Sequence, residues 1–376
     1  MKWCILLLVL AANVANAQNI REDREPEAST GVTEKVAQIS KDYMVVTANP
    51  YASWTGKNII EAGGNAIDAA VAIQAMLTLV EPQSSGIGGG AFMLYWDNQQ
   101  KRLHTFDGRE VAPQYATPFL FMQGEQPMKW LDAVVGGKSV GVPGVLRALE
   151  MAHDEFGALP WKTLFQDTIV TARDGFVVSE RLAKLIAMDI HPGLNTFISA
   201  QNYFKPNGIP LKRGQNKVNE LYSKALQQIA SKGADYFYNG ELASKIAQAT
   251  QLSTVNPGNM KGRDLAMYRA KKREPICGQY RNKKVCGMAP PSSGGINVYQ
   301  ILKLLEQYDL ASMGALSPEF VHVFSQASAL AYADRKHYIA DSDFTKLSAV
   351  SLINTSYMTQ RARLMDPDGP MFTAEP

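Results

Sequence analysis

The stretch Asn65-Ala-Ile-Asp-Ala-Ala-Val-Ala-Ile-Gln-Ala-Met-Leu-Thr-Leu-Val80 is followed, after Glu-Pro-Gln, by Ser84-Ser-Gly-Ile-Gly-Gly-Gly90. Asparagine favours the position that begins a helix, and the alanines after it allow close packing, so a helix is predicted over 65–80. Strand-like residues at Ala91–Trp96 and Leu103–Phe106 then predict a β-hairpin. A glycine loop that joins a helix to a strand indicates a fold that mixes α and β structure.

The sequence on both sides extends this pattern without an obvious linker or repeat, so residues 41–376 are predicted to form a single domain. Upstream, Tyr43–Ala48 is strand-like, and Asn49-Pro50 predicts the start of a helix that ends at Gly63-Gly64. Downstream, the apolar spacing predicts a helix that begins at Trp161 and ends at Gly175, and further helices at 218–231, 240–250, 295–307 and 317–338.

The composition excludes several classes of protein. The chain has 376 residues, of which 46% are apolar and 19% charged, so it can bury a large core and is neither disordered nor fibrous. It carries 38 basic and 35 acidic residues, a balance too even for a surface that neutralises nucleic-acid phosphates. Small molecules are therefore the expected partners, and nucleic acid is not.

Residues 1–17 have the pattern of a secretory signal. Lys2 supplies a positive charge, Trp3–Ala12 is an apolar run, and Ala15-Asn-Ala17 is a cleavage signal of small residues. A membrane anchor or a buried N-terminal strand is the alternative, but the run is shorter than the roughly 18 residues that span a bilayer. We therefore expect a periplasmic or secreted protein whose residues 18–40 form a flexible arm, with no other membrane-spanning stretch.

Two cysteines, Cys277 and Cys286, remain once Cys4 leaves with the signal. The residues between them predict a β-hairpin with Arg281-Asn282 as its two-residue turn, which sets the cysteines opposite one another. By alternation this is a non-hydrogen-bonded pair, where Cα atoms lie close enough for a disulfide bond that an exported protein can keep. Two free buried thiols are the alternative.

Two glycine-containing motifs suggest nucleotide chemistry, and neither has the context that this chemistry needs. Gly86-x-Gly88-x-x-Ala91 matches the dinucleotide fingerprint, but that fingerprint follows a strand and opens a helix, and here the predicted order is reversed. Gly137-Lys-Ser139 ends like a phosphate-binding P-loop, but Asp132 stands where the first glycine belongs. A nicotinamide or flavin enzyme is therefore not the favoured interpretation.

Gly137-Lys-Ser-Val-Gly141 also matches the nucleophile elbow of serine hydrolases. Strand-like residues precede it at Ala133–Val135, and a helix-like run follows it. Ser139 would need a downstream histidine, and His322 or His337 could serve by order along the chain. Both lie in a predicted helix, whereas such a histidine usually lies on a loop, so a serine hydrolase is a less favoured alternative.

Metal chemistry is not indicated by the sequence. The five histidines show no His-x-x-x-His spacing, and the cysteines show no Cys-x-x-Cys pair. Several acidic residues late in the chain are predicted to be solvated or to cap helices, because no periodic arrangement sets two of them together. They are Glu319, Asp334, Asp341 and Asp343.

A set of eight runs is more specific than any of these motifs. They are Glu61-Ala-Gly-Gly-Asn-Ala-Ile-Asp-Ala-Ala70, Val80-Glu-Pro-Gln-Ser-Ser-Gly-Ile-Gly-Gly-Gly90, Asp107-Gly-Arg-Glu110, Ser139-Val-Gly-Val-Pro-Gly144, Arg173-Asp-Gly-Phe176, Tyr268-Arg-Ala-Lys-Lys-Arg-Glu-Pro275, Pro290-Pro-Ser-Ser-Gly-Gly295 and Leu330-Ala-Tyr-Ala-Asp-Arg335. In this order they resemble the gamma-glutamyltranspeptidase family, over roughly residues 40–365.

The resemblance implies a fold and an assembly. The family belongs to the N-terminal-nucleophile hydrolases, whose α/β (α+β) fold is a four-layer αββα sandwich, and its members are precursors that cut themselves into large and small subunits. This chain resembles the large subunit only, so a second chain would complete the sandwich as a heterodimer. The catalytic threonine is expected immediately after Pro376, as the first residue of the small subunit, and no catalytic nucleophile is expected in this chain. That threonine would supply both the hydroxyl and an α-amine, of pKa about 7.7–8.0, that accepts its proton.

Arg109, in Asp107-Gly-Arg-Glu110, matches the family arginine that binds the α-carboxylate of the gamma-glutamyl group. A guanidinium presents a planar fork to a carboxylate, which both attracts and orients it. The resemblance implies a gamma-glutamyl donor such as glutathione, an amino-acid, peptide or amine acceptor or water, and no cofactor. An acylase of the same fold, acting on a glutaryl or cephalosporin side chain, and a non-catalytic gamma-glutamyl or amino-acid binding protein are the alternatives.

Overall fold

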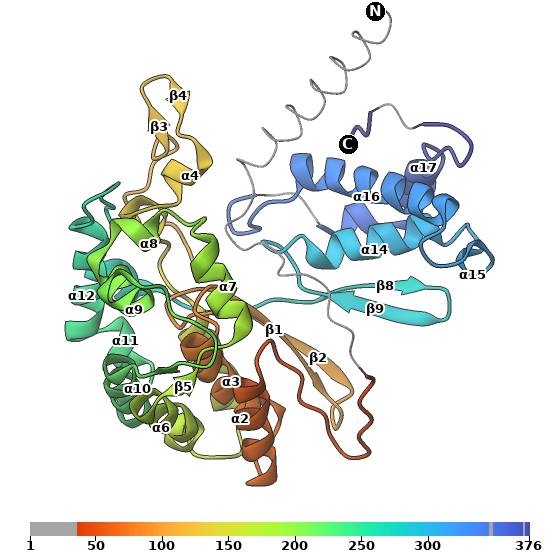
Figure 1. Cartoon of the computed structure of the whole chain (residues 1–376). Coiled ribbons are helices and arrows are strands. Elements are labelled where there is room, and N and C mark those ends of the chain that lie inside the picture. The colour runs from red at the N-terminus through yellow and green to blue at the C-terminus, as the bar shows by residue number, and fades with distance from the viewer. Residues whose placement is uncertain (1–35, 346–348, 371–372) are drawn as a thin grey trace, which may run out of the picture. The chain divides into compact units, whose positions relative to one another are not determined.

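The structure, a computed structural model, describes residues 36–345, 349–370 and 373–376. The described residues form two compact units, which Figure 1 shows. Unit 1 consists of the described residues of Met1–Ala91 and of Gly108–Ala270, and unit 2 consists of those of Phe92–Asp107 and Lys271–Pro376. The predicted signal at 1–17 and most of the predicted arm at 18–40 lie outside the described residues.

Unit 1 begins with two helices, α2 (Pro50–Glu61) and α3 (Ala66–Val80), whose starts are set by asparagine caps. The Asn49 side chain accepts a hydrogen bond from the amide of the second residue of α2. At α3 the Asn65 side chain accepts from the Asp68 amide while the Asp68 carboxylate accepts from the Asn65 amide, which satisfies two otherwise unpaired donors. Both predicted helices are therefore confirmed.

The rest of unit 1 is mainly helical. Its α-helices are α4 (Trp130–Ala133), α5 (Val145–Phe156), α6 (Gln166–Asp174), α7 (Glu180–Met188), α8 (Gly193–Thr196), α9 (Ile198–Phe204), α10 (Glu220–Lys232), α11 (Asp235–Tyr238), α12 (Gly240–Gln251) and α13 (Gly262–Met267). Three 3-10 helices, η1 (Gly137–Ser139), η2 (Trp161–Phe165) and η3 (Pro206–Gly208), and two small hairpins, β3 (Met122–Gln123) with β4 (Gln126–Pro127) and β5 (Phe176–Val177) with β6 (Asn216–Lys217), complete it. The helix predicted from Trp161 to Gly175 thus begins as η2 and continues as α6, with Gly175 as its C-cap.

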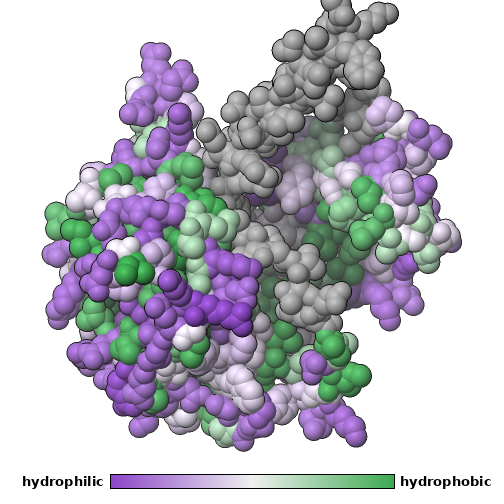
Figure 2. Space-filling view, viewed as in Figure 1, coloured by the Kyte–Doolittle hydropathy of each residue, from purple (hydrophilic) through white to green (hydrophobic). Residues whose placement is uncertain are grey.

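Helix α3 supplies much of the core of unit 1, as its alanine-rich sequence predicts. Its Met76, Leu79 and Val80 pack with Phe176 of β5 and with residues of α7 such as Leu182. Hydrophilic residues cover much of the visible face of this unit, including the tip of the β3–β4 hairpin, as Figure 2 shows. Among the described residues, no helix is both long and apolar enough to cross a bilayer.

Unit 2 combines two antiparallel sheets with helices (Figure 1). The predicted hairpin is present as β1 (Ala91–Asp97) and β2 (Arg102–Gly108), and β7 (Lys271–Lys272) extends it on the β2 side. The other elements are β8 (Ile276–Tyr280), β9 (Lys283–Gly287), α14 (Gly294–Leu305), α15 (Leu310–Met313), α16 (Pro318–Tyr338), the 3-10 helix η4 (Ala349–Ile353) and α17 (Thr355–Ala362). Among the described residues the largest sheet has three strands, and the four-layer sandwich is expected only of the complete two-chain protein.

The helices of unit 2 enclose an acid that the sequence analysis expected to be solvated or capping. Asp334 of α16 is buried, with its side chain 1% exposed. Gln300 of α14 donates to its Oδ2 at 2.7 Å, and Nη2 of Arg361 in α17 lies 3.0 Å from its Oδ1. The expectation for Asp334 was therefore wrong, because an arginine distant in sequence neutralises the carboxylate in the interior.

The predicted strand at Tyr43–Ala48 was also wrong, since these residues form no ladder. Val46 is 81% exposed and Met44 is 54% exposed, so the apolar side chains that suggested a strand are not buried against a sheet. A strand requires a neighbouring strand to pair its amides, and the sequence of a single segment does not contain that information.

The Cys277–Cys286 hairpin has the predicted register. Tyr280 pairs with Lys283 across the two-residue turn, and Cys277 lies opposite Cys286. Their Cα atoms are 4.1 Å apart, as in a non-hydrogen-bonded pair, and the structure joins the two sulfurs in a disulfide bond. Arg281 in the turn has a φ of 51°, the left-handed conformation that two-residue hairpin turns need.

We predict that this disulfide forms in the mature protein and is modestly stabilising. Closing a loop of about ten residues removes about 2–3 kcal/mol of unfolded-state entropy in the loop model, so Cys277→Ser should lower the free energy of unfolding by that amount without abolishing activity. Alkylation of the denatured, unreduced mature protein should find neither thiol. Two alkylated cysteines per chain would show that the bond does not form.

Candidate substrate-binding site

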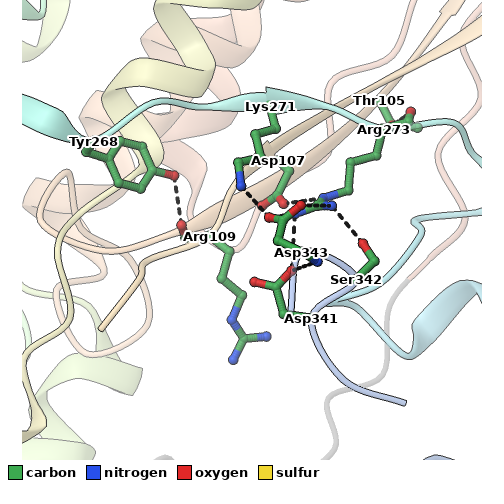
Figure 3. Close-up of polar contacts among 9 residues, drawn as sticks. All are labelled: Thr105, Asp107, Arg109, Tyr268, Lys271, Arg273, Asp341, Ser342 and Asp343. Carbon is green, nitrogen blue, oxygen red and sulfur yellow. Dashed lines mark hydrogen bonds and ion pairs between the residues drawn. The ribbon is translucent and has the colours of Figure 1, made fainter. Parts of the chain in front are cut away.

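Arg109 directly follows β2, and its backbone is held by a buried tyrosine. The Tyr268 hydroxyl donates a hydrogen bond to the Arg109 carbonyl oxygen at 2.7 Å (Figure 3). Tyr268 is 5% exposed and stacks on Tyr238, with ring centroids 5.9 Å apart and planes 15° from parallel. A residue distant in sequence thus fixes the peptide unit that follows the Arg109 Cα.

Glycines allow other backbone segments to approach the same place closely. A Cβ on Gly144 would lie 2.6 Å from Cζ of Tyr268, and one on Gly90 would lie 2.7 Å from the amide nitrogen of Glu110. A Cβ on Gly108 would lie 2.5 Å from Cβ of Ala148. Real Cβ atoms essentially never come so close to other atoms, so a side chain at any of the three positions would displace its neighbours.

Backbone hydrogen bonds join these segments. The amides of Gly144 and Val145 both donate to the Gly89 carbonyl, at 2.9 and 3.1 Å. Val111 and Val142 form an antiparallel bridge, with N–O distances of 3.3 and 2.8 Å in the two directions. Four runs that are far apart in the sequence and that carry the family resemblance therefore meet around Arg109: 84–90, 107–110, 139–144 and 268–275.

The Arg109 side chain projects from this framework with half of its surface exposed. Its Nε lies 3.5 Å from Oε1 of Glu110, whose side chain is 42% exposed, a separation at which a solvated ion pair contributes little. The structure thus combines a rigid backbone with an accessible guanidinium, which can offer parallel N–H donors to a carboxylate.

A second charged cluster, in unit 2, lies around Arg273 and is drawn in Figure 3. Its Nε donates to Oδ2 of Asp107 at 2.6 Å, and the side chains of these two residues are 11% and 6% exposed. Its Nη2 donates to Oδ2 of Asp343 at 2.9 Å, and the Lys271 ammonium pairs with the same carboxylate. The Arg273 guanidinium, followed by Lys271, lowers the pKa of Asp343 to about 2.

Two of the acids named from the sequence, Asp341 and Asp343, belong to this cluster, and Nη2 of Arg273 lies 3.5 and 2.9 Å from their carboxylates. Asp343 is exposed, as expected of a solvated acid, and the sequence did not indicate the two basic side chains that also hold it. The carboxylate of Asp341 does accept the Asp343 amide at 3.0 Å, as a capping acid would. The Tyr268–Pro275 run supplies both the tyrosine that contacts Arg109 and the arginine at the centre of the charged cluster. The concentration of polar residues in this run was the sequence signal that could have indicated their roles.

The nucleophile-elbow interpretation of Ser139 is not supported. Ala133 ends helix α4 and does not lie in a strand, and Ser139 lies in η1. The Ser139 hydroxyl donates to the carbonyls of Val134 and Gly136, at 2.8 and 3.1 Å, so it is engaged by its own loop. His322 lies in α16, as predicted, where its Nε2 contacts the Asp366 carbonyl oxygen at 3.0 Å.

The glycine loop and the possible metal ligands likewise form no nucleotide or metal site among the described residues. The loop at 84–90 follows α3 and leads into β1, so the order is the reverse of a dinucleotide fold, as predicted. In the described part of the chain, no group of three or more histidine, cysteine or acidic residues could hold a metal ion. A cavity of about 860 Å³ in unit 1 is lined by charged residues that include Arg147, Glu150 and Arg269, and Arg109 is not among them.

Comparison with known proteins identifies the family to which this chain belongs. A sequence model described as gamma-glutamyltranspeptidase matches residues 52–375. The chain belongs to the gamma-glutamyltranspeptidase family. It is similar to the glutathione hydrolase proenzyme of Bacillus subtilis (strain 168), with 36% identity over 366 residues that cover 97% of this chain and 62% of the relative. The chain thus spans less than two thirds of that proenzyme.

A solved structure and a further relative agree with this family. The Helicobacter pylori gamma-glutamyltranspeptidase superposes with a TM-score of 0.84 at 32% identity, covering 89% of this chain and 95% of that one. The predicted fold class, that of the N-terminal-nucleophile hydrolases, is confirmed by this similarity. The acylase ACY 1 proenzyme of Pseudomonas sp. (strain SE83) is also 36% identical, over 359 residues that cover 91% of this chain and 61% of the acylase.

We predict that Asp343→Asn makes the free energy of unfolding less dependent on pH in the acid range. Because the pKa of Asp343 falls from 3.8 to about 2 on folding, its charge stabilises the fold above about pH 4, and this contribution is lost as the pH falls toward 2. The variant should be about 1 kcal/mol less stable at neutral pH, and its decline between about pH 4 and pH 2 should be shallower.

Urea unfolding of the mature protein over this pH range is the measurement. Glu125→Gln, in the exposed turn between β3 and β4, is the control. It removes an acidic side chain that takes no part in the Arg273 cluster. A decline equally steep in Asp343→Asn and in the unmodified protein would contradict the role given to Asp343.

Proposed function

We propose that this chain is the large subunit of a gamma-glutamyltranspeptidase. The enzyme would transfer the gamma-glutamyl group of glutathione and related compounds to an amino acid, peptide or amine, or would hydrolyse it with water. The observation that carries the proposal is Arg109, whose half-exposed guanidinium stands on a backbone fixed by Tyr268 and by close-packed glycines.

Arg109 would bind the donor by its α-carboxylate. Two parallel N–H donors match the two carboxylate oxygens, so the contact fixes the direction of the ligand as well as its position. The gamma-carbonyl at the far end of the glutamyl group would then be presented to the nucleophile. Holding a substrate in a reactive orientation can supply a large part of a rate enhancement.

The nucleophile would be the threonine that begins the small subunit. Its hydroxyl would attack the gamma-carbonyl carbon while its own α-amine takes the hydroxyl proton, giving a gamma-glutamyl ester of the enzyme and releasing the amine of the donor. An acceptor amine or water would then attack the ester and regenerate the hydroxyl. The name proenzyme, which the relatives carry, supports two subunits from one precursor, and we expect the protein to be exported to the periplasm or secreted.

A glutaryl or cephalosporin acylase is the second candidate, favoured by the 36% identity to the Pseudomonas acylase. A glutaryl group has the same terminal carboxylate as a gamma-glutamyl group and lacks only the α-amine, so Arg109 could hold either. Comparing gamma-glutamyl and glutaryl anilides as substrates separates the two activities. A preference for the gamma-glutamyl anilide supports our proposal, and a preference for the glutaryl anilide supports the acylase.

We predict that Arg109→Ala and Arg109→Lys lower kcat/KM for a gamma-glutamyl anilide. The decrease should correspond to a loss of about 2–4 kcal/mol of transition-state stabilisation. Alanine removes the charge, and lysine keeps the charge but loses the planar fork. Neither change should lower the melting temperature much, because the side chain is half exposed. Arg213→Ala, which removes an exposed arginine elsewhere in unit 1, is the control. Unchanged kcat/KM in Arg109→Ala would refute the assignment.

We further predict that residues 18–376 expressed alone do not turn over gamma-glutamyl anilides, whereas the complete precursor does. The proposed nucleophile and its amine belong to the partner, and a bound carboxylate does not react without them. Strand edges and apolar surface that the partner would cover should also make the isolated chain associate or aggregate. Turnover by the isolated chain would contradict the two-chain proposal, and loss of that turnover in Ser139→Ala would then assign it to Ser139.

A further inference from the structure

Tyr268 stands in a position to control the direction of Arg109. We infer that Tyr268 is a positioning residue, whose hydroxyl selects for donors with a free α-carboxylate by fixing the Arg109 peptide. The inference rests on the proposed function of Arg109 and adds a second residue to it. Its basis is the 2.7 Å hydrogen bond from the Tyr268 hydroxyl to the Arg109 carbonyl oxygen, drawn in Figure 3.

The tyrosine ring is held so that its hydroxyl has little freedom to move. One side of the ring stacks on Tyr238, and the guanidinium of Arg147 lies 4.5 Å from the Tyr238 ring centroid. Arg147 is itself fixed by Glu150 at 2.7 Å and by Asp235 at 2.6 Å. Arg147 and Glu150, whose side chains are 14% and 25% exposed, therefore support the ring stack, whereas the Asp235 side chain is 70% exposed.

Gly144 brings the chain up to the same hydroxyl. A Cβ at this position would overlap the Tyr268 hydroxyl and the Gly108 carbonyl oxygen, so the chain passes there only without a side chain. The Gly144 amide is bonded to the Gly89 carbonyl, which prevents this segment from moving away. The phenol thus lies between a packed ring stack and a hydrogen-bonded backbone segment, which together restrict where its hydroxyl can hold the Arg109 carbonyl.

Fixing that carbonyl restricts the direction in which the Arg109 side chain leaves the backbone. The carbonyl sets the ψ angle of Arg109 and hence the direction in which its Cα–Cβ bond leaves the chain. The guanidinium stands at the end of a long side chain, so a small rotation at Cα displaces it by a larger distance. Bidentate binding of a carboxylate tolerates little misalignment, and a carboxylate donor therefore depends on this peptide more than a donor without the carboxylate does.

The test compares two substrates in the full-length, self-processed enzyme: a gamma-glutamyl anilide and its α-carboxamide, which lacks the negative charge. The measured quantity is the ratio of kcat/KM for the first substrate to kcat/KM for the second. This ratio is independent of how much of a variant folds or is processed. Tyr268→Phe, which removes only the hydroxyl, should lower the ratio about 10-fold, mainly through KM for the carboxylate substrate.

Tyr222→Phe is the matched control. The Tyr222 hydroxyl also donates to a backbone carbonyl, that of Ala75 at 2.9 Å, and it supports the α3 core without touching Arg109. It should leave the ratio unchanged. In an Arg109→Ala background, adding Tyr268→Phe should lower the ratio no further, because the hydroxyl acts through the arginine.

The outcomes separate the two claims. If Arg109→Ala collapses the ratio and Tyr268→Phe leaves it as Tyr222→Phe does, the role of Tyr268 is refuted and the proposed function stands. If Tyr268→Phe lowers both rates equally, the hydroxyl has a structural role only and the inference fails. If Arg109→Ala itself leaves the ratio unchanged, Arg109 does not bind the α-carboxylate and the proposed function fails with it.

Discussion

The absence of a side chain at Gly144 is the constraint on which the binding framework depends. Here the backbone lies against the Gly108 carbonyl and the Tyr268 phenol, and no residue with a Cβ fits without displacing one of them. Gly90 plays the corresponding part beside Glu110. The glycine motifs of this chain therefore serve close backbone packing, a common use of glycine besides phosphate binding. They hold the backbone at Arg109 in close contact with its neighbours while leaving its side chain half exposed.

The charged clusters of unit 2 have a different role from Arg109. Arg273 and Arg361 pair with acids whose side chains are largely buried, Asp107 at 6% exposed and Asp334 at 1%. Bringing such charges out of water is costly, and removing one partner would leave the other uncompensated. These pairs therefore hold the segments around 341–343 and the helices α14, α16 and α17 in one arrangement. Exposure distinguishes them from Arg109, whose side chain is half exposed.

Features with a local cause could be predicted from the sequence. The cap at Asn65 and the register of the Cys277–Cys286 hairpin depend on residues within a few positions of one another, and both are found as predicted. Arg109 itself was found through the family motif, because a lone arginine after a strand gives no chemical signal. The role of its neighbours Gly144 and Tyr268 required the tertiary structure, since they lie 35 and 159 positions further along the chain.

Predictions failed where a distant partner decides the structure. Residues at Ala133–Val135 were strand-like, but none of the described strands pairs with them and Ala133 ends helix α4. Asp334 was expected to be solvated or capping, because nothing near it in the sequence indicates the arginine that neutralises it. Asp343 is exposed as expected, but its pairing with Arg273 was not foreseen. Single-sequence patterns report periodicity and caps, whereas ion pairs and ladders between distant segments depend on how the chain folds back on itself.

The central claim is that a fixed backbone aims the Arg109 guanidinium at the carboxylate of a gamma-glutamyl ligand. A crystal structure of the mature two-subunit enzyme with glutamate bound tests it most directly. We predict two parallel hydrogen bonds from Arg109 to the α-carboxylate, at about 2.7–2.9 Å, with the hydrogen bond from Tyr268 to the Arg109 carbonyl retained. A carboxylate bound by another cation, with the Arg109 side chain in solvent, would contradict the claim.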